Sequence, residues 1–287
     1  MGSNNEYWQR TSFVADNMDD LVFQGIQHIQ EFGERLVSRN GPGLQAFQVD
    51  YVLTNSRSRL HLLRAPDTIR YLCRELIAYF RGSLLVKDGL SDASTSWERF
   101  AKPDGSINSN YGYYVFRLKT DDRSQYEWVI RTLLENIQSR RALININLPS
   151  HKNLSDPDFP CTVALQFLVR EQALCCEVAA RSVDAVVGLP YDLGFFSFLT
   201  ELIACDLAVR TGKPIWAGYT SLRCTFTQVY DATREKADAV LLSQLPETPL
   251  AMPRITEPSA VLSDIHEGTS LSPIVQWIRE HRDYGQE

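Results

Sequence analysis

The sequence lacks the cysteine patterns that mark a zinc site or a disulfide framework. Its six cysteines, at positions 73, 161, 175, 176, 205 and 224, form no CxxC pair and have no zinc-ligand spacing. In a chain of this size without a secretory segment, such thiols are expected to be free and mostly buried. We therefore expect no metal ion, and a reactive cysteine has to be identified from its neighbours.

Long apolar runs and an excess of positive charge are also missing. No hydrophobic run reaches the length of a membrane span, and the N-terminal MGSNNEYWQR has no apolar core of the kind found in signal peptides. The formal net charge of −6 disfavours a non-specific nucleic-acid binder. We expect a cytoplasmic protein that binds neither membranes nor nucleic acids, in which local basic clusters can still bind a phosphate.

The chain has the size and composition of a globular enzyme with one domain, residues 1–287. It is 44% hydrophobic and contains no internal repeats. Asp19 and Asp20 are expected to cap the first helix, and residues 83–113 are expected to form a long loop with some short helix. Helical periodicity covers 21–37, 65–82, 124–138, 195–212 and 272–282; strand patterns cover 46–54, 142–148, 162–169, 173–180 and 214–230. Strands and helices are mixed without strict alternation, which favours an α+β fold.

Three short motifs between residues 160 and 192 carry the functional signal. They are Pro160-Cys161, then Arg181-Ser182 with Asp184, then Gly188-Leu-Pro-Tyr-Asp192. This order and separation resemble the thymidylate synthase family. Upstream matches extend the resemblance to about residues 20–230, and the last fifty or so residues match only weakly; these upstream residues are Arg39, Glu75, Trp97, Tyr111, Arg140 and Arg141.

The resemblance implies a mixed β-sheet that packs at a homodimer interface, with helices around it. It also implies a pyrimidine nucleotide whose phosphate needs several guanidinium groups. The expected phosphate ligands are Arg39, Arg181 and the Ser182 hydroxyl, together with Arg140 and Arg141, which reach into the neighbouring subunit's site.

The family's chemistry implies roles for the remaining matched residues. Cys161 is expected to attack C6 of the base, which makes C5 nucleophilic toward the one-carbon unit of 5,10-methylenetetrahydrofolate. The Arg181 guanidinium is expected to favour the Cys161 thiolate. Glu75 is expected to organise water and proton transfers, and Tyr111 to assist removal of the C5 proton. The folate side is expected to include Trp97, Asp184 and Gly188.

Asp192 departs from the family pattern, which has asparagine at this position to pair with uracil. A protonated carboxyl can donate to cytosine N3 and accept from its amine, and after N3 gains a proton the carboxylate can accept from both. The same change is found in the deoxycytidylate hydroxymethylases of the family, which add water instead of hydride. Asp also caps helices, but Asn caps equally well, so capping does not explain the choice.

A second departure concerns the sugar. The family has a Gly-Asp-x-His-x-Tyr stretch whose His and Tyr hold the deoxyribose 3′-hydroxyl, and the stretch GYTSLRCT places Ser221 and Arg223 there. This favours CMP over dCMP as the substrate, as in the CMP 5-hydroxymethylases of mildiomycin-type antibiotic pathways. The alternatives are a dCMP hydroxymethylase, a thymidylate synthase, and a non-catalytic relative that binds nucleotide or RNA. Thr162 also replaces the His that commonly follows the catalytic cysteine.

Overall fold

A single mixed β-sheet organises the protein. The computed structural model describes residues 9–244 and 250–286, so most of the N-terminal segment discussed above lies outside the described residues. The strands follow the order β1-β3-β9-β8-β7-β6, and β2 pairs with β3. Parallel pairs (β1 with β3, β8 with β9) and antiparallel pairs both occur, which confirms the α+β class.

The N-terminal third builds one half of the sheet. β1 (Thr11–Ala15) leads to α1 (Met18–Phe32), which is capped by Asn17 and not by the predicted aspartates. The predicted helix ends early, because residues 34–38 form β2 (Glu34–Ser38), which pairs with β3 (Gly41–Leu53). β2 and β3 therefore form a tight hairpin, and Arg39 and Asn40 lie at its turn.

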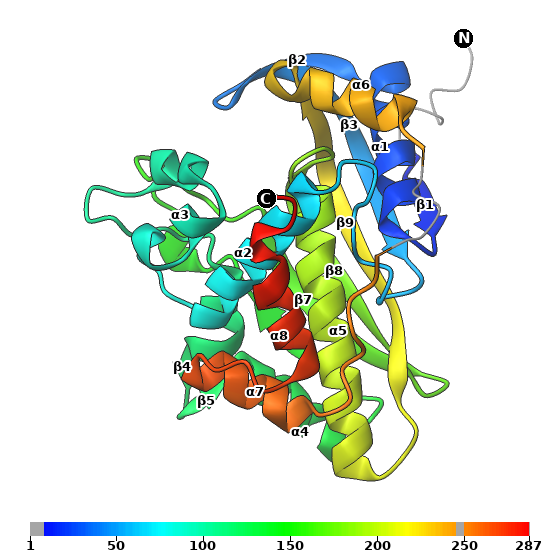
Figure 1. The fold of residues 1–287 in the computed structure, drawn as a ribbon, viewed down its shortest axis with the longest axis vertical. Coiled ribbons are helices and arrows are strands. Elements are labelled where there is room, and N and C mark those ends of the chain that lie inside the picture. The colour runs from blue at the N-terminus through cyan, green and yellow to red at the C-terminus, as the bar shows by residue number, and fades with distance from the viewer. Residues whose placement is uncertain (1–8, 245–249, 287) are drawn as a thin grey trace.

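The C-terminal half of the sheet surrounds one long helix. β6 (Leu143–Asn145) pairs with β7 (Thr162–Arg170), which forms a hairpin with β8 (Ala173–Asp184). The chain then crosses over through α5 (Leu189–Thr211) to the parallel strand β9 (Trp216–Tyr230). α5 lies against the sheet (Figure 1), and almost every one of its side chains is buried.

Helix α2 (Asp67–Arg81) forms the wall opposite the C-terminal end of β8, and Gly82 ends it with a φ of 59°. The segment after it contains short turns of helix: Val86–Asp88, α3 (Leu90–Ala93), Thr95–Phe100 and Tyr113–Arg117. It packs closely on α2, since a Cβ at Gly112 would overlap the Tyr79 carbonyl. This contact holds Tyr111 beside the inner face of α2.

The remaining helices cover the outside of this core. α4 (Gln125–Glu135) follows the small β4–β5 pair (Lys119–Thr120 and Arg123–Ser124), and α6 (Arg234–Leu242) packs on α1. α7 (Pro258–Glu267) and α8 (Pro273–Glu280) bring the C-terminal end of the chain beside α2 (Figure 1). Among the described residues, no helix has the length and apolarity needed to cross a membrane.

Candidate active site

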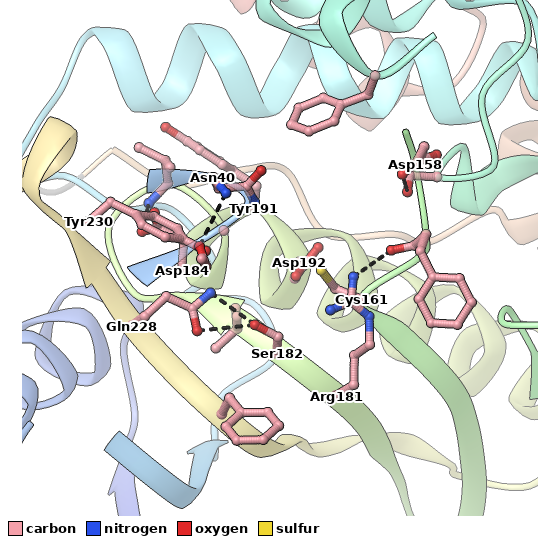
Figure 2. Close-up of a pocket in the computed structure, with 18 of the residues that line it drawn as sticks. Asn40, Asp158, Cys161, Arg181, Ser182, Asp184, Tyr191, Asp192, Gln228 and Tyr230 are labelled. Atoms are coloured by element: carbon pink, nitrogen blue, oxygen red, sulfur yellow. Dashed lines mark hydrogen bonds between the residues drawn. The ribbon is translucent and has the colours of Figure 1, made fainter. Parts of the chain in front are cut away.

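A cavity of about 390 Å³ opens between α2, the N-terminal end of α5 and the ends of β8 and β9 (Figure 2). This volume suits a small organic ligand. It collects ten of the predicted site residues from segments far apart in the sequence: Arg39, Glu75, Trp97, Tyr111, Cys161, Arg181, Ser182, Asp184, Gly188 and Asp192.

Four predicted residues lie outside this cavity. Arg140 and Arg141 are exposed on the loop before β6, where the Arg141 guanidinium stands over the Trp128 ring. Ser221 is buried within β9, and Arg223 is exposed and faces Asp50 at 4.0 Å. The single chain therefore places none of these four side chains at the cavity.

Cys161 lies at the floor of the cavity, immediately before β7. Its carbonyl accepts a hydrogen bond from the Arg181 backbone N–H at 2.9 Å, which ties the cysteine to β8. Burial raises the pKa of the Cys161 thiol to about 11, and the nearby Arg181 guanidinium offsets only part of this shift. Arg181 therefore acts in the expected direction, toward the thiolate, but burial has the larger effect on the pKa of Cys161 in the ligand-free site.

Asp192 lies in the first turn of α5, close to Cys161 (Figure 2). The helix begins at Leu189 with Gly188 as its N-cap residue, so Asp192 does not cap it. Burial raises the pKa of Asp192 to about 7. Its carboxyl can therefore carry a proton near neutral pH and offer a ligand both a donor and an acceptor.

Glu75 is a second buried carboxyl in the same cavity. Burial, reinforced by the charge of Asp192, raises the pKa of Glu75 to about 8. Two acids that both titrate near neutral pH can accept and return protons during a reaction at little cost. Such a pair, next to the half-buried Cys161 thiol, is suited to covalent chemistry with proton transfers.

Comparison with known proteins agrees with this geometry. The family model described as Thymidylate synthase matches residues 23–260. The chain belongs to the thymidylate synthase family. Its members are folate-dependent one-carbon transferases that act on pyrimidine nucleotides and are typically dimeric. The match extends about thirty residues beyond the end that the sequence motifs suggested.

Two relatives show the range of the family. The thymidylate synthase of Coxiella burnetii is 25% identical over 235 residues, which are 80% of this chain and 84% of that protein. The deoxycytidylate 5-hydroxymethyltransferase of Enterobacteria phage T4 is 32% identical over 157 residues, which are 51% of this chain and 63% of the phage protein.

The C-terminal end of β9 lies at the cavity. Phe226, Gln228 and Tyr230 line it, and they follow directly after the stretch chosen from the sequence, residues 218–225. Gln228 and Tyr230 have the same spacing as the family's His-x-Tyr pair. The sequence signal for this pair therefore lay in FTQVY and not in GYTSLRCT. The tyrosine of that pair is kept, and a glutamine replaces the histidine.

Gln228 is linked to the predicted phosphate ligand Ser182. The Gln228 side-chain nitrogen and oxygen lie 2.9 and 3.1 Å from the Ser182 hydroxyl (Figure 2). Arg181 donates to the carbonyls of Phe159 (2.6 Å) and Pro160 (3.2 Å), which uses two of its five N–H groups and leaves the others for a ligand. Together with Arg39 at the β2–β3 turn, this end of the cavity suits a phosphate.

Asp158 is a cavity residue that the sequence did not indicate. It is buried three residues before Cys161, where its carboxylate accepts from the Asn108 backbone N–H and the Ser109 hydroxyl, both at 2.7 Å. Burial also raises the pKa of Asp158. Asp158 therefore joins Glu75, Asp184 and Asp192 as a fourth cavity acid, on the side of Cys161 away from Gln228 (Figure 2).

Aromatic side chains line another part of the cavity, which we call the aromatic shelf. Trp97 and Phe100 meet edge to face with centroids 6.0 Å apart, and both line the cavity with Tyr71 and Tyr191. Flat rings of this kind fit a planar heterocycle such as the pterin of a folate. Asp184 and Gly188 border the same space, but one Asp184 oxygen already accepts from the backbone N–H groups of Val186 and Val187.

Proposed function

We propose that this protein transfers a hydroxymethyl group from 5,10-methylenetetrahydrofolate to C5 of CMP, with water as the source of the hydroxyl. The products are 5-hydroxymethyl-CMP and tetrahydrofolate. The observation that carries the proposal is the Asp192 carboxyl, which lies beside Cys161 and whose pKa is raised by desolvation to about 7. A carboxyl in this state matches the N3 and amine edge of cytosine, because it both donates and accepts.

Cys161 forms the covalent bond to C6 of the base. Its proton must first leave, since burial keeps it a thiol, and the buried carboxylates of the cavity are the available acceptors. As the thiolate adds, Asp192 gives its proton to N3 and then accepts hydrogen bonds from N3–H and the amine. Methylenetetrahydrofolate supplies the one-carbon unit that becomes attached to C5.

The later steps are proton transfers and release. Tyr111, stacked between the rings of Tyr79 and Phe196, lies against the cavity and assists loss of the C5 proton. As that proton leaves, the bond between the one-carbon unit and the folate nitrogen breaks, tetrahydrofolate departs, and a methylene group remains on C5. Glu75 and Asp158 hold water near the new methylene group, and one water adds to it. Elimination then restores the ring and frees the Cys161 sulfur, which retakes a proton.

The sugar preference rests on Gln228. A glutamine offers an acceptor and two donors where the family has an imidazole, which supports recognition of a ribose with two neighbouring hydroxyls. The name of the phage relative favours dCMP instead. The two candidates share the base, the phosphate and the chemistry, and differ only at the 2′ carbon.

The reaction can be measured with CMP, dCMP or dUMP that carries tritium at C5, in the presence of methylenetetrahydrofolate. We expect release of tritium from CMP and a product heavier than CMP by one hydroxymethyl group. A faster reaction with dCMP would assign the deoxynucleotide. A methylated uracil formed together with dihydrofolate would identify a thymidylate synthase, and no release from any nucleotide would leave only a binding function.

We also propose that the protein is a homodimer in which Arg140 and Arg141 complete the neighbour's phosphate site. Their exposure and their distance from the cavity of their own chain support this. Cys161→Ala protein mixed with the Arg140→Ala/Arg141→Ala double variant, after dissociation and reassembly, is expected to recover about one quarter of wild-type activity. Half of the dimers then have one intact site, whereas arginines that serve their own chain would give no recovery.

A further inference from the structure

A hydrogen-bond chain connects the aromatic shelf to the buried carboxyl of Glu75. The Trp97 indole N–H donates to the Tyr71 hydroxyl at 2.9 Å, and the Tyr71 hydroxyl donates to Glu75 Oε1 at 3.1 Å. Trp97 comes from the segment after α2, whereas Tyr71 and Glu75 lie one turn apart on the inner face of α2. All three line the cavity.

The direction of this chain is fixed by chemistry. An indole nitrogen can only donate, so the Tyr71 oxygen is the acceptor in the first bond. The Tyr71 proton is then available for Glu75 Oε1, which accepts it when Glu75 is ionised or carries its own proton on Oε2. Burial raises the pKa of Tyr71 well above its ordinary value, so the phenol keeps this proton at any pH at which the enzyme works. The ring itself is held by Tyr191, whose centroid is 4.2 Å away.

We propose that Tyr71 is a positioning residue for Glu75: it confines the transferable proton of Glu75 to Oε2 and connects this carboxyl to Trp97 on the folate side. The reference to a folate side rests on the proposed function, whereas the link between the three side chains does not. A ligand that displaces the Trp97 indole changes the hydrogen bond that the Tyr71 hydroxyl donates to Glu75. Binding of a ligand at the Trp97 side of the cavity thereby affects the proton on Glu75.

The other groups around Glu75 do not connect it to Trp97. Asp192 from α5 disfavours the ionised form of Glu75, and Tyr79, one turn further along α2, favours it through a side-chain hydrogen bond, as Tyr71 does. The charge of Glu75 raises the pKa of Tyr191 of α5, and the Tyr191 ring contacts the ring of Tyr71. Among the described residues around Glu75, Tyr71 alone both bonds to the carboxyl and bonds to the aromatic shelf.

The Tyr71→Phe variant tests this role, because it keeps the ring and removes only the hydroxyl. The titration of Glu75 can be followed in the ligand-free protein by NMR of ¹³C-labelled glutamate carboxyls, with Glu75→Gln to assign the signal. Loss of a donor to the carboxylate is expected to raise the titration midpoint of Glu75 by about one unit. Trp97→Phe is expected to move it in the same direction by less, since Tyr71 remains.

Tyr126→Phe is the matched control. It removes a buried hydrogen bond of 3.0 Å from a tyrosine to the Asp206 carboxylate, between α4 and α5 and outside the cavity. We expect it to lower thermal stability without moving the Glu75 midpoint. In turnover, Tyr71→Phe is expected to lower kcat and shift its pH profile upward, with less than about a twofold change in nucleotide KM.

An unchanged Glu75 midpoint in the folded Tyr71→Phe protein would overturn the inference. In an Asp192→Asn background, where the charge of Asp192 no longer acts on Glu75, Tyr71→Phe must also raise the titration midpoint of Glu75. Because the NMR measurement needs no substrate, it separates two failures. A shifted midpoint in a protein without hydroxymethylase activity rejects the proposed reaction and keeps the role of Tyr71.

Discussion

Cys161→Ala is expected to abolish turnover, with a loss of at least about 10⁴-fold in kcat, while nucleotide binding stays within about tenfold of wild type. The reason is that the sulfur forms the bond to C6, whereas the arginines, Gln228 and Asp192 that recognise the nucleotide remain in place. Isothermal titration with CMP and the tritium-release assay measure the two quantities separately.

Cys205→Ala is the control for this variant. Cys205 is a half-buried free thiol on α5 that does not line the cavity. It is expected to keep activity within about twofold, since truncating a partly buried cysteine disturbs packing only locally. Activity that survives in Cys161→Ala would assign the nucleophile elsewhere, and equal losses in both variants would indicate damage to the fold.

The raised pKa of Cys161 predicts that the reactivity of its thiol depends on pH. Because burial raises the pKa of Cys161 to about 11, the ligand-free protein is expected to react slowly with iodoacetamide at pH 7 and progressively faster as pH rises toward that value. Peptide mass spectrometry identifies the modified residue. Rapid alkylation of Cys161 at pH 7 would mean that the guanidinium of Arg181 outweighs burial.

The parts of the site that could be predicted from sequence are those that lie within short motifs. Cys161, Arg181 and Asp192 come from three stretches separated by a hairpin and a turn, and their order along the chain identified them. The helix predicted from residue 195 begins six residues earlier, at Leu189, so Asp192 lies inside it. Local sequence was enough here because each motif residue keeps its place relative to its own strand or helix.

The register of β9 could not be predicted in the same way. A strand repeats every two residues, so a His-x-Tyr pattern can be placed on several equivalent positions of a long strand. Only the pairing of Asp184 with Gln228 in the assembled sheet shows which end of β9 meets the cavity. Sugar recognition was therefore assigned to Ser221 and Arg223, which lie too early in the strand.

Tyr71 and Tyr79 were missed for another reason. On an amphipathic helix they count as ordinary core residues, and α2 is otherwise apolar on this face. Their positions four residues before and four after Glu75 did place three polar groups in one line, which is a signal for a shared function. Asp158 gave no such signal, because its surroundings in the sequence are those of a loop.

Asp192→Asn is expected to reverse the choice of base. For cytidylates we expect kcat to fall by about 10²- to 10⁴-fold with a small change in KM, because an amide can still pair with the base edge but has no proton to give to N3. For uridylates we expect kcat/KM to rise by about 10²-fold or more, because the amide can turn to accept from N3–H and donate to O4. Parallel assays with CMP, dCMP, UMP and dUMP measure both changes, and Asp192→Ala, which offers neither bond, is the control that must lose all four.

The same substitution has a consequence for stability that needs no substrate. The pKa of Asp192 rises from 3.8 to about 7 on folding, so the unfolded chain releases this proton first and wild-type stability falls as pH increases from about 4 to about 7. Asparagine does not titrate, so Asp192→Asn is expected to gain stability relative to wild type through this interval and to keep the gain above it. Thermal unfolding of both proteins between pH 5 and 8.5 measures the difference. A gain that is the same at every pH would mean that Asp192 stays ionised in the folded protein, and the carboxyl could then not provide the proton that cytosine N3 requires.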